Sequence, residues 1–161
     1  MSVVNNNKED RLEANRTLLK AVIQMCRLGG DFYNLIGQNI KHYAIKQVCF
    51  DMAKSYFKQI PELVEIAQAR YQLSEQETMT STSIEDYYHN ILSKQVKLNP
   101  PDLLKHLIEV EEQHLAELNN AIDATSELEV KGAISKVVAQ IIVTYQKLTD
   151  LTHSISDNQT S

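Results

Sequence analysis

The sequence predicts an all-α protein, a bundle of long helices joined by few turns. Only four glycines and three prolines occur among 161 residues, whereas a β-sandwich or an α/β fold of this length needs many more turn residues. Apolar residues recur at steps of three and four along most of the chain, which is the spacing of one buried helix face. We expect one helical domain over residues 9–156, a disordered N-terminus at 1–8 and a flexible tail at 157–161.

The first long helix is predicted from near Glu9 to about Ile40. Gly29 and Gly30 interrupt its apolar stripe, and such a pair can end a helix, kink it or let a neighbouring helix approach closely. The stripe keeps its phase through Ile36, so we expect the helix to continue past the glycines. The stripe consists of Leu18, Val22, Met25, Gly29, Phe32 or Tyr33, and Ile36.

A second long helix is predicted at 43–73, with a kink at Pro61 because proline removes one backbone donor. A polar linker follows at 74–82. Thr82 and Glu85 then form a capping box, which predicts a short helix at 84–93. The inward positions of the second helix are Cys49, Met52, Tyr56 and Ile60.

The run Asn99-Pro100-Pro101 is the strongest stop signal in the sequence, and Asp102 is the expected cap of a third long helix that ends near Ala124. A last long helix is predicted from about Glu127 to Ile155. The stripe of the third helix consists of Leu104, Ile108, Glu111, Leu115, Leu118 and Ile122, and that of the last consists of Val130, Ile134, Val137, Ile141, Tyr145, Leu148, Leu151 and Ile155.

This order of elements predicts a ferritin-like four-helix bundle. Two antiparallel helical hairpins, at 9–73 and 102–155, are joined by a long crossover at 74–101 that contains the short helix. A simple up-down-up-down bundle would not need so long a connection. We expect the first and last helices to be in contact along Val22 and Ile141.

Glu111 and His114 are the strongest candidates for a functional site. They stand three residues apart on a predicted helix, so one helix can direct both side chains to a metal ion. A dinuclear iron or manganese centre needs two such Glu-x-x-His steps and a glutamate from each of the two other helices. The second helix has no such step, and Asp31, the nearest carboxylate of the first helix, is the third candidate metal ligand. The alternative is an ordinary acidic face on which Glu111 is satisfied by lysine, tyrosine or water.

No pattern for nucleophilic catalysis is present. Cys26 and Cys49 lie on apolar stripes and are expected to be reduced core residues. The other histidines stand singly in polar surroundings, where surface positions are expected. We therefore predict no catalytic residues.

The run Cys26-Arg27-Leu28-Gly29-Gly30-Asp31-Phe32-Tyr33, together with Glu111 in the third helix, resembles an uncharacterised bacterial family of ferritin-like four-helix-bundle proteins. The resemblance covers about residues 12–151. Leu28 and Gly30 stand where the family has acidic residues, and Leu118 stands where it has an aromatic residue. The resemblance implies the ferritin-like fold and a stress-related setting.

Partners are constrained by charge and by the crossover. A net charge of −5 argues against nucleic-acid binding, and no apolar run is long enough to span a membrane. We expect a cytoplasmic protein. The short helix carries an aromatic patch. A helix this short is not stable alone, so the patch must pack either against its own bundle or against a second copy of the chain, and we predict a homodimer. The patch consists of Tyr87, Tyr88, Ile91 and Leu92.

The sequence thus leaves two hypotheses about function. The first is a module that binds itself or another protein and lacks a complete dinuclear metal site. The second is a ferritin-like protein or oxidase that binds iron or manganese through Glu111 and His114.

Overall fold

The computed structural model describes residues 2–79, 93–94 and 97–160, with side chains described only between residues 7 and 155. All regular secondary structure in these ranges is helical, as predicted. Within them, no helix is long and apolar enough to cross a membrane. The elements are α1 (Ser2–Asn39), α2 (Tyr43–Lys58), α3 (Ile60–Tyr71), the short 3₁₀ helix η1 (Gln76–Thr78), α5 (Pro100–Ala124) and α6 (Leu128–Thr160).

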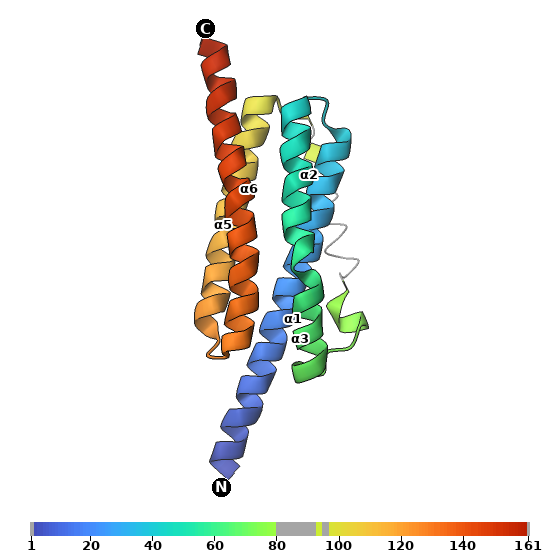
Figure 1. Cartoon of the computed structure of the whole chain (residues 1–161), viewed down its shortest axis with the longest axis vertical. Coiled ribbons are helices and arrows are strands. Elements are labelled where there is room, and N and C mark those ends of the chain that lie inside the picture. The colour runs from blue at the N-terminus through green and yellow to red at the C-terminus, as the bar shows by residue number, and fades with distance from the viewer. Residues whose placement is uncertain (1, 80–92, 95–96, 161) are drawn as a thin grey trace.

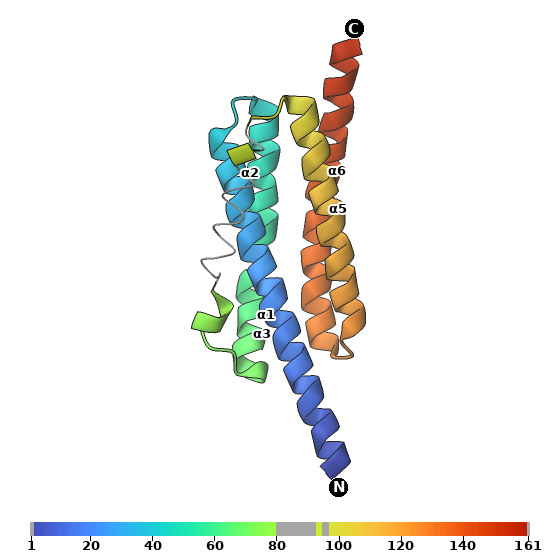
Figure 2. The ribbon, with the colours of Figure 1, turned by 180° about the vertical axis from the view of Figure 1, so that it is seen from behind.

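The long helices lie side by side in a bundle, and α2 continues into α3 as one rod (Figures 1 and 2). Helices α1 and α6 run in one direction along the bundle, whereas α2, α3 and α5 run in the other. The pair α1 and α2 meets the pair α5 and α6 mainly where α2 packs against α6. All of these helices contribute to a single buried core.

The expected contact between the first and last helices is present but slight. Helix α6 packs chiefly along α5 and α2 and contacts α1 over a short stretch. Val22 and Ile141 nevertheless both belong to the common core. Helices at diagonal positions of a bundle are separated by core side chains. Two such helices can therefore share a core although their backbones are not in close contact.

Two interruptions of the helical pattern behave as the sequence predicts. Helix α1 runs unbroken through Gly29 and Gly30. The second rod breaks before Pro61, since α2 ends at Lys58 and α3 begins at Ile60 with the proline in its first turn. Proline is tolerated there because the first turn of a helix has no intrahelical partner for that N–H.

The helix ends differ from the expected ones. Helix α1 begins at Ser2 rather than near Glu9, and α6 ends at Thr160 rather than at Ile155. Apolar periodicity reports only the packed part of a helix, and backbone hydrogen bonds continue beyond it. Helix α5 is capped by Asn99 rather than by Asp102, because the Asn99 side chain accepts a hydrogen bond of 3.0 Å from the Asp102 N–H.

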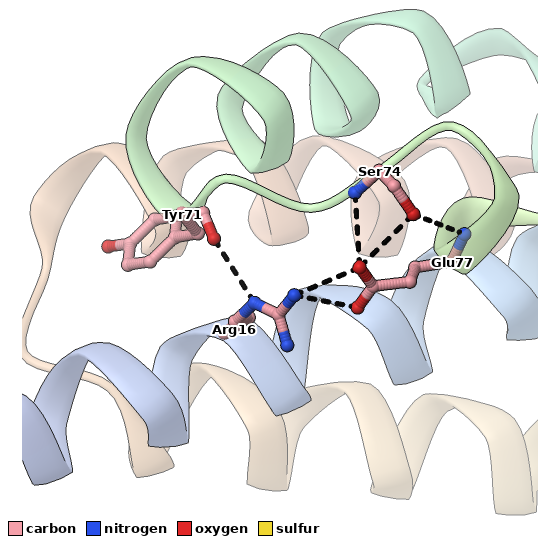
Figure 3. A network of polar contacts seen from close by, with 4 residues as sticks. All are labelled: Arg16, Tyr71, Ser74 and Glu77. Atoms are coloured by element: carbon pink, nitrogen blue, oxygen red, sulfur yellow. Dashed lines mark hydrogen bonds and ion pairs between the residues drawn. The ribbon is translucent and has the colours of Figure 1, made fainter.

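The predicted polar linker begins with a segment that docks on α1 (Figure 3). The Arg16 guanidinium donates to both carboxylate oxygens of Glu77, at 2.7 and 3.0 Å, and to the Tyr71 carbonyl at 3.2 Å. Arg27 donates to the Thr78 carbonyl at 2.7 Å. The Ser74 backbone N–H, which also donates to the Glu77 carboxylate, is the main cause of the lowered pKa of Glu77. These contacts hold η1 against the first helix.

The short helix predicted in the crossover falls almost entirely outside the described residues. Only Ser93 and Lys94 of that region are described before residue 97. The aromatic patch and the capping box belong to the part that is not described.

Candidate functional site

A cluster of four polar side chains lies inside the bundle, where α1, α2 and α5 face one another. Its members are Tyr33 of α1, Tyr56 of α2, and Glu111 and His114 of α5. Tyr33, Tyr56 and Glu111 are completely buried, and His114 is 8% exposed. A carboxylate at such a position is rare unless its oxygens have partners.

Both oxygens of the Glu111 carboxylate accept a hydroxyl proton. The Tyr33 hydroxyl donates to Oε1 at 2.5 Å, and the Tyr56 hydroxyl donates to Oε2 at 2.7 Å. The Tyr56 oxygen also lies 2.7 Å from Nδ1 of His114. A tyrosine hydroxyl has one proton, and here it goes to Glu111, so Nδ1 of His114 must be the donor to Tyr56. The four side chains therefore form one continuous hydrogen-bonded chain from His114 to Tyr33.

Ring contacts fix the orientation of the cluster. The rings of Tyr33 and Tyr56 stack with centroids 6.0 Å apart and an interplanar angle of 15°. The imidazole of His114 meets the Tyr56 ring edge-on, also at 6.0 Å. Burial is the main cause that raises the pKa of Tyr33 well above its usual value, and the neighbouring Glu111 charge adds to it. Tyr33 is thus held as a neutral phenol.

Gly29 makes the room that Tyr56 needs. A Cβ atom at Gly29 would lie 2.9 Å from two carbons of the Tyr56 ring, which is closer than normal packing allows. Close approach of a neighbouring helix was one of the roles predicted for the glycine pair, and here the neighbour is α2. In this way the backbone of α1 positions a side chain of α2.

The structure brings two of the three predicted metal ligands together. Glu111 and His114 lie one turn apart on α5, with Nδ1 3.6 Å from Oε1. Asp31 lies on α1 only two residues from Tyr33, yet it is exposed. Among the described residues, no three His, Cys, Asp or Glu side chains gather closely enough to hold a metal ion.

The two tyrosines are the members of the site that sequence reasoning did not assign. The signal was present, because Tyr33 and Tyr56 fall on apolar stripes and a buried tyrosine hydroxyl needs a hydrogen-bond partner. Glu111 on the stripe of α5 needed donors for the same reason. Tyrosine was one of the partners expected for Glu111 if it served no metal.

The ligands of a dinuclear iron or manganese centre do not fit this site. Such a centre takes carboxylates from four helices and two histidines. Here one carboxylate and one histidine come from α5, and α1 and α2 supply phenols that occupy both carboxylate oxygens. On α6, the buried Thr144 hydroxyl donates to the Met52 sulfur at 3.0 Å. The cluster is not a two-metal carboxylate site.

The cysteines are buried core residues, as predicted. Cys26 and Cys49 are free thiols with no exposed surface. Burial raises the pKa of both thiols to about 12. A thiol that does not ionise at neutral pH is a poor nucleophile.

Comparisons with known protein families, with curated proteins and with solved structures gave no match to this chain.

Proposed function

We propose that the chain is a ferritin-like helical bundle without a dinuclear metal centre, and that it works as a self-associating binding module. The shared direction of α3 and α5 supports the ferritin-like path, because hairpins connected in that way need a long return between them (Figures 1 and 2). The phenols on Glu111 support the absence of a dinuclear centre.

The observation that carries self-association is the outer face of α6. Leu128, Ile142 and Val143 are 83%, 48% and 58% exposed. They belong to an uncharged stripe that alternates steps of four and three from Leu128 to Ile142, with Val143 beside Ile142. We call it the α6 outer face, and it consists of Leu128, Gly132, Ser135, Ala139, Ile142 and Val143.

The shape of this face suits a second helix. A Cβ atom at Gly132 would meet nothing within 4 Å, and Ser135 and Ala139 are also small and exposed. Small residues let two helices approach closely, and alternating steps of four and three form the seam of paired helices. From Leu128 to Val143 the face is about 24 Å long at 1.5 Å per residue.

The charges beside the face point to a second copy of the chain as its partner. On one side of it, Glu129, Lys136 and Lys147 are each paired within the chain, with Arg70, Glu62 and Asp51 respectively, and Lys131 stands on the other side. A charged partner would gain little on the paired side, whereas two copies related by a two-fold axis can meet along the uncharged stripe itself. One pair of helices buries less surface area than a standard protein–protein interface. The dimer is therefore weak, and the dimeric fraction depends on the protein concentration.

Light scattering over a wide concentration range tests the proposal. We expect the mass to rise from 18.3 kDa toward twice that value and to stay at the monomer value in Ile142→Glu. Tyr88→Glu, which alters the aromatic patch of the crossover, is the matched control and should dimerise like the wild type. Dimerisation lost in Tyr88→Glu and kept in Ile142→Glu would overturn the α6 outer face as the interface. A monomer at every concentration would overturn self-association itself.

A further inference from the structure

The buried cluster holds five metal-ligating donor atoms that lie close together in one hydrogen-bonded chain. Two phenol oxygens, two carboxylate oxygens and Nδ1 of His114 come from four side chains. The separations between hydrogen-bonded neighbours are 2.5, 2.7 and 2.7 Å. With metal–ligand bonds of about 2.0–2.2 Å, ligand atoms at right angles lie about 2.8–3.1 Å apart. Each of these three hydrogen-bonded pairs would have to separate by about a few tenths of an ångström to become neighbouring ligands of one ion.

We propose that Tyr33, Tyr56, Glu111 and His114 form a mononuclear site for a trivalent cation, with Fe³⁺ as the ion. This site is distinct from a dinuclear carboxylate centre, because it uses phenolates from α1 and α2 where such a centre uses glutamates. It does not depend on self-association, since all of its ligands lie inside one chain.

Charge balance selects the trivalent ion. Two phenolates and one carboxylate carry three negative charges, which Fe³⁺ neutralises. With both phenols ionised, a divalent ion would leave a net negative charge in the buried cluster, and an uncompensated buried charge is costly. Anionic oxygen ligands with one imidazole also form a hard donor set of the kind that iron accepts.

Binding balances in protons without any change of oxidation state. Tyr33 and Tyr56 each release a phenol proton when the oxygen–iron bond forms. Glu111 binds as the carboxylate that it already is. His114 binds through Nδ1 as a neutral imidazole, so its proton moves to Nε2. The net result is one Fe³⁺ bound and two protons released.

The surroundings favour a preorganised site with one route of access. The ligands stand on helices, and stacked rings hold both tyrosines in place. His114 is the only one of the four with exposed surface, so it is the side from which an ion would enter. Ligands on rigid elements lose little freedom when an ion binds.

The test adds Fe³⁺, as its nitrilotriacetate complex, to the purified chain and records visible absorption and bound iron. Ferric phenolate gives an intense visible charge-transfer band that neither phenol nor a ferric carboxylate gives. We expect the band, with one iron per chain, in the wild type. Tyr145→Phe is the matched control, since the Tyr145 hydroxyl donates at 2.8 Å to the exposed Glu112 outside the cluster. It should keep the band.

The double variant Tyr33→Phe with Tyr56→Phe should lose the absorption band, and its affinity for iron should fall at least tenfold. Circular dichroism shows whether this variant is still folded. His114→Gln provides a second variant if the double variant does not fold, and it should shift the band and weaken binding. No band in the wild type, or a band that survives in the folded double variant, would overturn the proposal. Equal affinity for Mn²⁺ or Zn²⁺ would overturn the trivalent assignment.

Discussion

Removing the Tyr33 hydroxyl tests whether the buried cluster contributes to stability. Tyr33→Phe deletes one oxygen atom and keeps the ring that stacks on Tyr56. Tyr33 and Glu111 are both completely buried, so water cannot replace the lost donor. Nδ1 of His114 lies 3.6 Å from Oε1 of Glu111, which is beyond hydrogen-bond distance.

The expected cost follows from that geometry. A hydrogen bond to a charged group contributes about 1.5–3 kcal/mol, and we expect Tyr33→Phe to lower the free energy of unfolding by about 2 kcal/mol. For a chain of this size, that lowers the melting temperature by about 4–8 °C.

A double-mutant cycle with Glu111→Leu assigns the cost to the hydrogen bond. Glu111→Leu removes the acceptor and leaves two buried hydroxyls without it. In that background Tyr33→Phe removes an unsatisfied hydroxyl, so it should be neutral or stabilising. The coupling energy between the two positions should be about 2 kcal/mol. Urea denaturation followed by circular dichroism measures all four chains under one condition.

Two outcomes would refute this reasoning. A cost of Tyr33→Phe below about 0.5 kcal/mol, the usual range of surface changes, would mean that the hydrogen bond contributes little. An equal cost in both backgrounds would mean that the hydroxyl acts through some other contact. Tyr145→Phe, whose partner Glu112 is exposed, serves as the surface control and should cost less than about 1 kcal/mol.

Three further predictions concern the glycines and the cysteines. Gly29→Ala should destabilise by about 1–3 kcal/mol because its Cβ meets the buried Tyr56 ring, whereas Gly132→Ala, which meets nothing within 4 Å, should stabilise by up to about 1 kcal/mol. Urea midpoints that move in the same direction for both would contradict this. Cys26 and Cys49 should resist iodoacetamide in native buffer and react in urea, and rapid native labelling would contradict their burial. The pKa of both thiols is about 12 in the folded chain against the model-peptide value of 9.0. The unfolded chain therefore releases these protons first, and stability should fall as the pH rises above 9; unchanged stability across that range would contradict the shift.

The sequence alone determined where the long helices lie and which side chains are buried on most of them. The stripe of the last helix was correct at Val130, Ile134, Val137, Ile141 and Leu148. Periodicity succeeds there because the residues that share a helix face are fixed by the helix itself. The missing backbone N–H of proline likewise predicted the interruption of the second helix at Pro61.

The rotation of α5 about its own axis was predicted only in part. Leu104, Glu111 and Leu118 are buried as expected, but Leu107 and His114 are also buried, and Ile108 and Leu115 are only partly so. The predicted stripe was therefore rotated to one side of the face that is actually buried. The neighbouring helices determine which side of an apolar stripe is covered, and the sequence of α5 alone carries no information about their positions.

The hydrogen-bond donors of Glu111 could not be predicted without the packing of the helices. Its two donors lie 55 and 78 residues away in sequence, on helices whose rotation and axial register relative to α5 no local pattern encodes. A shift of one residue in that register would move either hydroxyl away from the carboxylate, since successive residues on a helix point about 100° apart. The same dependence kept Asp31 out of the site and brought Tyr33 in, because the face of α1 that meets α5 is set by packing between distant segments.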